Sequence, residues 1–112
     1  MELHDGTADL IAERFRALGE PTRLLILASL RDGERTVGDL VDLTGSGQAN
    51  ISKHLQLLHR HGFVERRKEG TSSFYRIADP AVFELCDLVC GTIREQLERQ
   101  QQVLATDGSR AG

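Results

Sequence analysis

Short polar side chains gather on one face of the segment that follows Gly47. Apolar residues recur there at four- and three-residue spacing, at Ile51, Leu55 and Leu58, and this spacing predicts an amphipathic helix that ends near Arg60. The opposite face carries amide, hydroxyl, ammonium and imidazole groups, on Gln48, Asn50, Ser52, Lys53 and His54. Side chains of this length at the start of a helix reach base edges and phosphates in a DNA major groove. We expect these five residues to bind DNA; the alternative is an ordinary solvent-exposed helix face.

Basic side chains follow in a second segment. Residues 63–68 are predicted to form a strand, residues 69–72 a turn, and residues 73–77 the returning strand of a hairpin. Because side chains alternate across a strand, Arg66 and Lys68 share one face and Arg67 lies on the other. We expect Arg66, Lys68 and Thr71 to contact DNA, and Arg67 to form an ion pair within the scaffold.

The charge of the chain is unevenly distributed. The formal net charge is −3 and the isoelectric point is about 5.8, values that by themselves argue against a nucleic-acid partner. Residues 46–77, however, contain six basic and two acidic side chains, a net charge of +4, and the remainder of the chain carries −7. A local basic surface on an acidic body is what attraction to DNA requires.

Two cysteines, Cys86 and Cys90, are the other residues with a chemistry of their own. They lie four residues apart on the predicted final helix and share a face with Val89, Ile93 and Leu97, an apolar stripe that we assign to dimerisation. One interpretation is that they only pack there, because a buried free cysteine behaves as a small hydrophobe. The other is that thiols of two subunits meet across the dimer axis and bind a soft metal or metalloid, or respond to oxidation. The residues alone leave both interpretations open, and no other cofactor is expected.

A single small domain must position these side chains. The patterns predict helices over 8–18, 21–30, 36–44 and 48–60, the hairpin, and a last helix from Asp79-Pro80. Two short helices joined by a glycine-containing turn make a helix-turn-helix unit, and the hairpin is its wing. The predicted fold class is mainly α with a small β-hairpin, a winged helix-turn-helix that dimerises through its terminal helices. The domain spans residues 1–104, and residues 105–112, which have nothing to bury, are expected to form a disordered tail.

Several classes of protein are not expected. No apolar stretch is long enough to span a membrane, and the residues after Met1 do not resemble a leader peptide, so we expect a cytoplasmic protein without a membrane partner. The chain has no nucleophile paired with a base and no glycine-rich phosphate loop, so we do not expect an enzyme. At 112 residues it is too small to include a separate ligand-binding domain.

Three stretches resemble the ArsR/SmtB-type family of winged-helix regulators, the arsenic-repressor family. They are residues 17–27 (Ala-Leu-Gly-Glu-Pro-Thr-Arg-Leu-Leu-Ile-Leu), 48–55 (Gln-Ala-Asn-Ile-Ser-Lys-His-Leu) and 62–70 (Gly-Phe-Val-Glu-Arg-Arg-Lys-Glu-Gly). The resemblance implies a homodimeric transcriptional repressor that binds a palindromic DNA operator and is released by a metal ion or another signal. The alternative is a winged-helix protein-interaction module without effector sensing, which should have lost the polar face that this chain keeps.

The metal sites typical of this family do not carry over to this chain. Its soft-metal motif, E-L-C-V-C-D-L, aligns with residues 34–40, where Thr36 and Gly38 occupy the two thiolate positions. Its zinc site on the last helix resembles D-x-H followed by H-x-x-E, of which only Asp79 and Glu95 are present. Two carboxylates without histidine are a poor set of zinc ligands. We therefore expect no metal at either place, and any release signal must act elsewhere.

Overall fold

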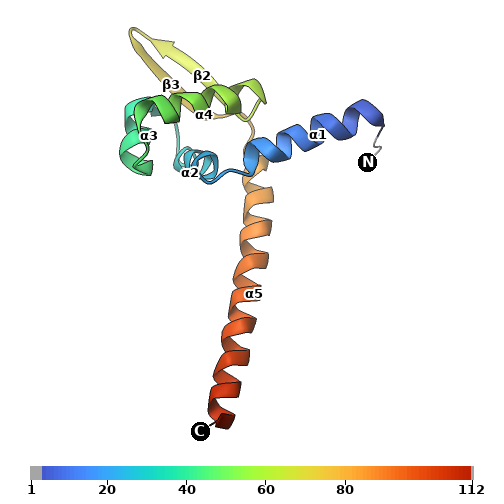
Figure 1. The fold of residues 1–112 in the computed structure, drawn as a ribbon. Coiled ribbons are helices and arrows are strands. Elements are labelled where there is room, and N and C mark those ends of the chain that lie inside the picture. Colours follow the sequence, from blue (N-terminus) through green and yellow to red (C-terminus); the bar gives the residue numbers. More distant parts are fainter. Residues whose placement is uncertain (1–3, 112) are drawn as a thin grey trace. The chain divides into compact units, whose positions relative to one another are not determined.

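The computed structural model describes residues 4–111, except for the side chains of residue 5 and of residues 105–111 (Figure 1). The chain divides into two compact units, Met1–Asp79 and Pro80–Gly112, and each is described by itself.

The predicted order of four helices, a hairpin and a helix is confirmed. The first unit consists of α1 (Asp5–Leu18), α2 (Pro21–Ser29), β1 (Arg35–Thr36), α3 (Val37–Thr44), α4 (Gln48–Arg60), β2 (Val64–Glu69) and β3 (Ser72–Ile77). One element, β1, was not predicted. It pairs with β3 and makes a three-stranded antiparallel sheet of order β1-β3-β2. A strand of two residues is too short to produce an alternating pattern, so the sequence does not reveal it.

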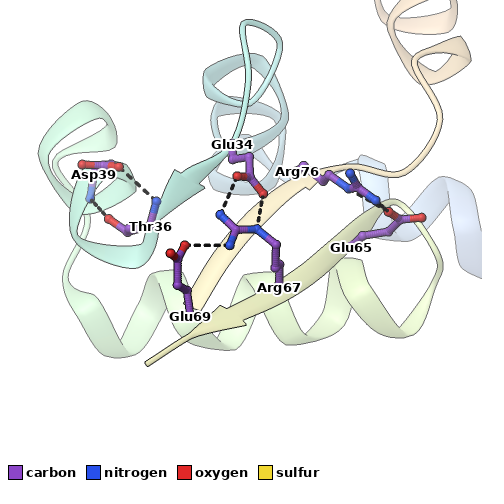
Figure 2. Close-up of polar contacts among 7 residues, drawn as sticks. All are labelled: Glu34, Thr36, Asp39, Glu65, Arg67, Glu69 and Arg76. Atoms are coloured by element: carbon purple, nitrogen blue, oxygen red, sulfur yellow. Dashed lines mark hydrogen bonds and ion pairs between the residues drawn. The ribbon is translucent and has the colours of Figure 1, made fainter. Parts of the chain in front are cut away.

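Side-chain caps decide where the two central helices begin. Glu20 precedes Pro21, the first residue of α2, and its carboxylate accepts a hydrogen bond of 2.9 Å from the Arg23 backbone N–H. Proline suits this position because a backbone N–H would have no helical partner there. Thr36 and Asp39 form a capping box at the start of α3, in which each side chain accepts the other's backbone N–H (Figure 2). Local contacts therefore fix the start of each helix.

Two glycines make the turns that orient the functional segments. Gly45 ends α3 in the left-handed conformation, with φ 76°, and the chain enters the next helix at Gln48. Gly70, with φ 61°, occupies the first position of the two-residue turn between Glu69 and Ser72. A positive φ at that position suits the twist of a hairpin. A side chain at either glycine would be strained.

The core of the first unit lies between its helices and the sheet. Its most deeply buried side chains, at most 2% exposed, are Ala17, Ile26, Leu27, Leu30, Leu40, Ile51, Leu55, Leu58 and Val64. They come from α1, α2, α3, α4 and β2, so burial of one apolar cluster holds all five elements together. A helix pair or a hairpin alone would be marginally stable, and this shared core is what gives the helix-turn-helix unit and its wing a fixed geometry.

The second unit is the single helix α5 (Ala81–Ala111). A disordered tail was expected for residues 105–112, whereas the helix continues to Ala111; Gly112 lies outside the described residues. Large apolar side chains stand exposed along it, at Leu85, Leu88, Val89, Ile93, Leu97, Val103 and Leu104. Among the described helices, none is long and apolar enough to cross a membrane.

Candidate nucleic-acid interface

The polar face of α4 is oriented by its apolar residues. Ile51, Leu55 and Leu58 have no exposed surface, and together they fix the rotation of the helix about its axis. As a result Gln48, Asn50 and Lys53 are exposed and Ser52 is half-buried. Four of the five side chains predicted to face outward from this helix therefore reach its solvent-accessible surface.

His54 does not have the outward orientation predicted for this face. Only 8% of this residue is exposed, and its ring faces α2. Arg23 Nη1 lies 3.1 Å from His54 Nδ1, and because a guanidinium only donates, Nδ1 is the acceptor. Glu20 Oε2 lies 3.8 Å from His54 Nε2. His54 stands at the border of the apolar stripe, three residues after Ile51, and these partners draw it inward.

Arg23 is the centre of a small polar network within the first unit. Its Nε donates to the carbonyl of Ala17 at 2.6 Å and its Nη2 to the carbonyl of Arg16 at 3.1 Å. With its bond to His54, this guanidinium connects the end of α1 to α4. The pKa of Glu20 is lowered, chiefly by the hydrogen bond from the Arg23 backbone N–H. The contacts of this side chain are therefore intramolecular.

One exposed residue on α4 was missed by the sequence analysis. Gln56 lies one helical turn after Ser52 and Lys53 and is exposed on the same side of the helix. Its amide can donate and accept hydrogen bonds in the same way as that of Gln48. The four-residue spacing from Ser52 was the signal that could have identified it.

Arg67 adds ion pairs to the contacts that hold the wing on the rest of the unit. Its guanidinium lies 2.8 Å from Glu34 and 2.7 Å from Glu69 (Figure 2). It also stacks over Phe74, 4.6 Å from the centre of the ring. The hydrogen bond from Arg67 lowers the pKa of Glu34, and the bonds to Glu34 and Glu69 raise the pKa of Arg67. The prediction that Arg67 forms a scaffold ion pair is confirmed.

The other basic side chains of β2 lie on the opposite face of the strand. Arg66 is paired in register with Tyr75, and Lys68 with Ser73. Both basic side chains are exposed, as is Thr71 in the turn. In Figure 1 the turn of the hairpin projects beyond the neighbouring helices. The hairpin therefore presents two cations and a hydroxyl near its free end.

Ion pairs cancel the acidic charge of the basic segment. Both of its acidic residues are paired with arginines, Glu65 with Arg76 at 2.7 Å and Glu69 with Arg67. Four basic side chains of residues 46–77 have no ion-pair partner among the described residues, and they are Lys53, Arg60, Arg66 and Lys68. The surface of α4 and the wing therefore keeps free positive charge, which phosphate contacts need.

The two cysteines lie on α5 and are both free thiols, Cys86 half-buried and Cys90 exposed. Among the residues whose side chains are described, no three His, Cys, Asp or Glu side chains are grouped closely enough to hold a metal ion. A subunit therefore offers at most these two thiols to a soft ligand.

The part of the chain that carries this interface is similar in sequence to known proteins. Residues 20–66, from the cap of α2 through α4 into β2, match the family described as "Bacterial regulatory protein, arsR family". An uncharacterized HTH-type transcriptional regulator of Methanocaldococcus jannaschii is 46% identical over 79 residues, 70% of this chain and 89% of that protein. A probable mercury resistance operon repressor of Streptomyces lividans is 40% identical over 77 residues, 69% of this chain and 62% of that longer protein.

A solved structure extends the likeness to the fold. The homodimeric winged helix-turn-helix DNA-binding domain of a Mycobacterium bovis protein superposes with a TM-score of 0.74 and 37% identity, over 88% of this chain and 95% of that one. The predicted fold class, a mainly helical winged helix-turn-helix with a small hairpin, is confirmed by this likeness.

Proposed function

The chain belongs to the ArsR family of bacterial regulatory proteins, and on that premise we propose that it represses transcription as a homodimer bound to a palindromic DNA operator. Proteins of this family are DNA-binding transcription regulators and not enzymes. The observation that carries the proposal is the polar surface at the start of α4, where Gln48, Asn50 and Lys53 are exposed, together with the unpaired Arg66 and Lys68 on β2.

We assign base reading to α4 and phosphate contacts chiefly to the wing. The amides of Gln48 and Asn50 offer a donor and an acceptor at once, the combination that pairs with an adenine edge. Lys53 and Ser52, with Gln56 one turn later, extend the same surface. Arg66, Lys68 and Thr71 lie at the hairpin, where contacts to phosphates would set the position of α4 without reading sequence.

The apolar residues of α5 are proposed to bind a second copy of the chain. Exposed side chains such as Leu88, Val89, Ile93 and Leu97 are costly in water, and their number suits a dimer surface. The mycobacterial domain with the similar fold is homodimeric. Two copies of α4 about 34 Å apart would enter successive major grooves, and the two-fold symmetry of the dimer would match a palindrome.

Two roles are proposed for the cysteines, and both depend on the dimer. Cys86 and Cys90 would either pack between subunits or provide four thiols to a soft metal, a metalloid or an oxidant that releases the operator. One relative is named for mercury resistance, and mercury is a soft metal. The thiols are a candidate sensor because they are the soft ligands of the chain.

A salt titration on the DNA upstream of the gene tests the proposal. If a dimer makes six to eight phosphate contacts, log K should fall against log salt with a slope of roughly −5 to −7. A shuffled sequence of the same length serves as the control and should bind at least about a hundredfold more weakly at physiological salt. Binding that does not change with salt, or that is equal for both sequences, would refute the proposal.

A further inference from the structure

An open cavity of about 330 Å³ is lined by residues of α1, of the start of α2 and of the C-terminal end of α4. Its polar walls are Glu13 and Arg16 from α1, Arg23 from α2, and Arg60 with the adjacent His61 from the end of α4; Ala17 and Leu57 complete the lining. Its size is at the lower end of the range of about 300–1,000 Å³ typical of small-molecule sites. None of its residues belongs to the DNA-reading surface or to α5.

The cavity is strongly cationic. Three guanidiniums face a single carboxylate, that of Glu13, so the lining carries a net charge of +2 before any protonation of His61. Arg16 and Arg60 have no side-chain ion pair or hydrogen bond with any described residue. Bringing like charges together around a recess is unfavourable unless a counter-charge enters it.

The arginines of the cavity keep donors free for a ligand. Arg23 has five N–H groups, and its bonds to Ala17, Arg16 and His54 account for one each from Nε, Nη2 and Nη1. Two of its N–H groups are therefore uncommitted. Guanidiniums bind carboxylate and phosphate through pairs of parallel hydrogen bonds. The apolar surfaces of Ala17 and Leu57 can contact a short carbon skeleton, and Glu13 can accept from a ligand hydroxyl.

We propose that this cavity binds a small hydroxylated dianion, a phosphate monoester or a dicarboxylate of metabolite size, with Arg16, Arg23 and Arg60 as its anion-binding residues. The ligand connects α1 to the C-terminal end of α4. It also adds negative charge to the domain that carries the basic wing. The ligand contacts Arg23, whose guanidinium donates a hydrogen bond to His54 of α4. Operator affinity therefore falls when the ligand is bound. This last consequence rests on the proposed function, whereas the binding itself does not.

Calorimetry on the full-length protein tests the binding, with glycerol 3-phosphate, malate and inorganic phosphate as probes and glycerol as the uncharged control. Chloride is kept at about 0.1 M to screen non-specific attraction. We expect glycerol 3-phosphate or malate to bind once per subunit with a Kd below about 1 mM, and Arg16→Gln and Arg60→Gln each to weaken binding about tenfold. Arg14→Gln is the matched control, because Arg14 is exposed on the same helix but does not line the cavity.

Absence of binding by all three anions, or binding that survives both cavity substitutions, overturns the proposal. Operator affinity is measured in parallel, first without any anion. Arg16→Gln, which lies outside the proposed DNA surface, should leave it unchanged; if it weakens operator binding as much as Lys68→Gln does, the arginine cluster binds DNA phosphate and not an effector. With the bound anion at saturation, wild-type operator affinity should fall at least about threefold, and an unchanged affinity overturns the regulatory role. Failure of the wild type to bind any operator would instead refute the proposed function, while the calorimetric result would stand.

Discussion

Arg67 Nη2 lies 2.8 Å from Glu34 Oε1, and this pair joins the wing to the turn that precedes β1. The two residues are thirty-three positions apart in the chain. Arg67 lies on the face of β2 opposite to Arg66 and Lys68, so its ion pair leaves those two exposed cations uncommitted. The ion pair itself is half-exposed, and we expect it to act on the position of the wing more than on overall stability.

Replacement of Glu34 by glutamine tests this role. Glu34→Gln should weaken operator binding about two- to fivefold. A hairpin that is less firmly held in the free protein loses more conformational freedom when it contacts phosphates. Glu65→Gln is the matched control, since it breaks an ion pair within the hairpin and leaves the Glu34–Arg67 connection intact. Equal losses in the two variants, measured by fluorescence anisotropy on labelled operator, would contradict a special role for Glu34.

The same pair predicts a pH dependence. The pKa of Glu34 in the folded protein is lowered from 4.5, first by the hydrogen bond from Arg67. Its contribution to stability is therefore complete above about pH 5 and is lost as the pH falls through the folded pKa. The difference in Tm between wild type and Glu34→Gln should shrink between about pH 5 and pH 3, and thermal unfolding by circular dichroism measures it. A constant difference over this range would show that the carboxylate charge does not matter.

Substitution of His54 should change stability and not base preference. His54→Ala removes the acceptor of Arg23 Nη1 and leaves a small cavity, which should lower the free energy of unfolding by about 1–3 kcal/mol. His54→Gln keeps an acceptor and should recover part of this loss. Urea denaturation measures both variants, and binding to a panel of operator variants gives their base preference. A changed preference in folded His54→Gln would return His54 to the DNA-reading surface.

Gln48 and Lys68 should affect DNA binding in different ways. Gln48→Ala should cost about 1–3 kcal/mol at particular base pairs of the operator and relax the preference there. Lys68→Gln should weaken binding to all sequences similarly and make the salt slope less steep by about 1 for each subunit. Competition assays with single-base operator variants separate the two effects. Should Gln48→Ala weaken all sequences equally, the assignment of base reading to Gln48 would be wrong.

A charge on the apolar face of α5 should prevent dimerisation. Ile93→Glu places a carboxylate in the stripe assigned to the interface, and desolvating it there would be costly. We expect a monomer in sedimentation or light scattering, with operator affinity reduced at least about a hundredfold because the second α4 is lost. Arg94→Glu, at the adjacent exposed position, is the control and should remain dimeric. A dimeric Ile93→Glu protein would place the interface elsewhere.

The cysteines can be tested by release of the operator. Cys86→Ser and Cys90→Ser keep the size of the side chain and remove the soft ligand. If the thiols form a sensor, arsenite, divalent soft metals or oxidants should release wild type and fail to release the variants. Normal release of both variants by every inducer that acts on wild type would leave packing as the role of the thiols.

Much of the fold and of the interface could be predicted because the signals are local. The three- and four-residue spacing of Ile51, Leu55 and Leu58 identifies α4 and the outward orientation of Gln48 and Lys53. Alternation along β2 is enough to separate Arg67 from its basic neighbours.

The tertiary structure alone decided what depends on residues distant in the chain. His54 lies at the edge of the apolar stripe, where periodicity permits either orientation, and it turns inward because Arg23, thirty-one positions earlier, donates to its ring. The pairing of β1 with β3 and the gathering of Arg16, Arg23 and Arg60 around one cavity likewise have no local signature. Periodicity states which face of an element is apolar, whereas packing determines which side chains from different elements meet.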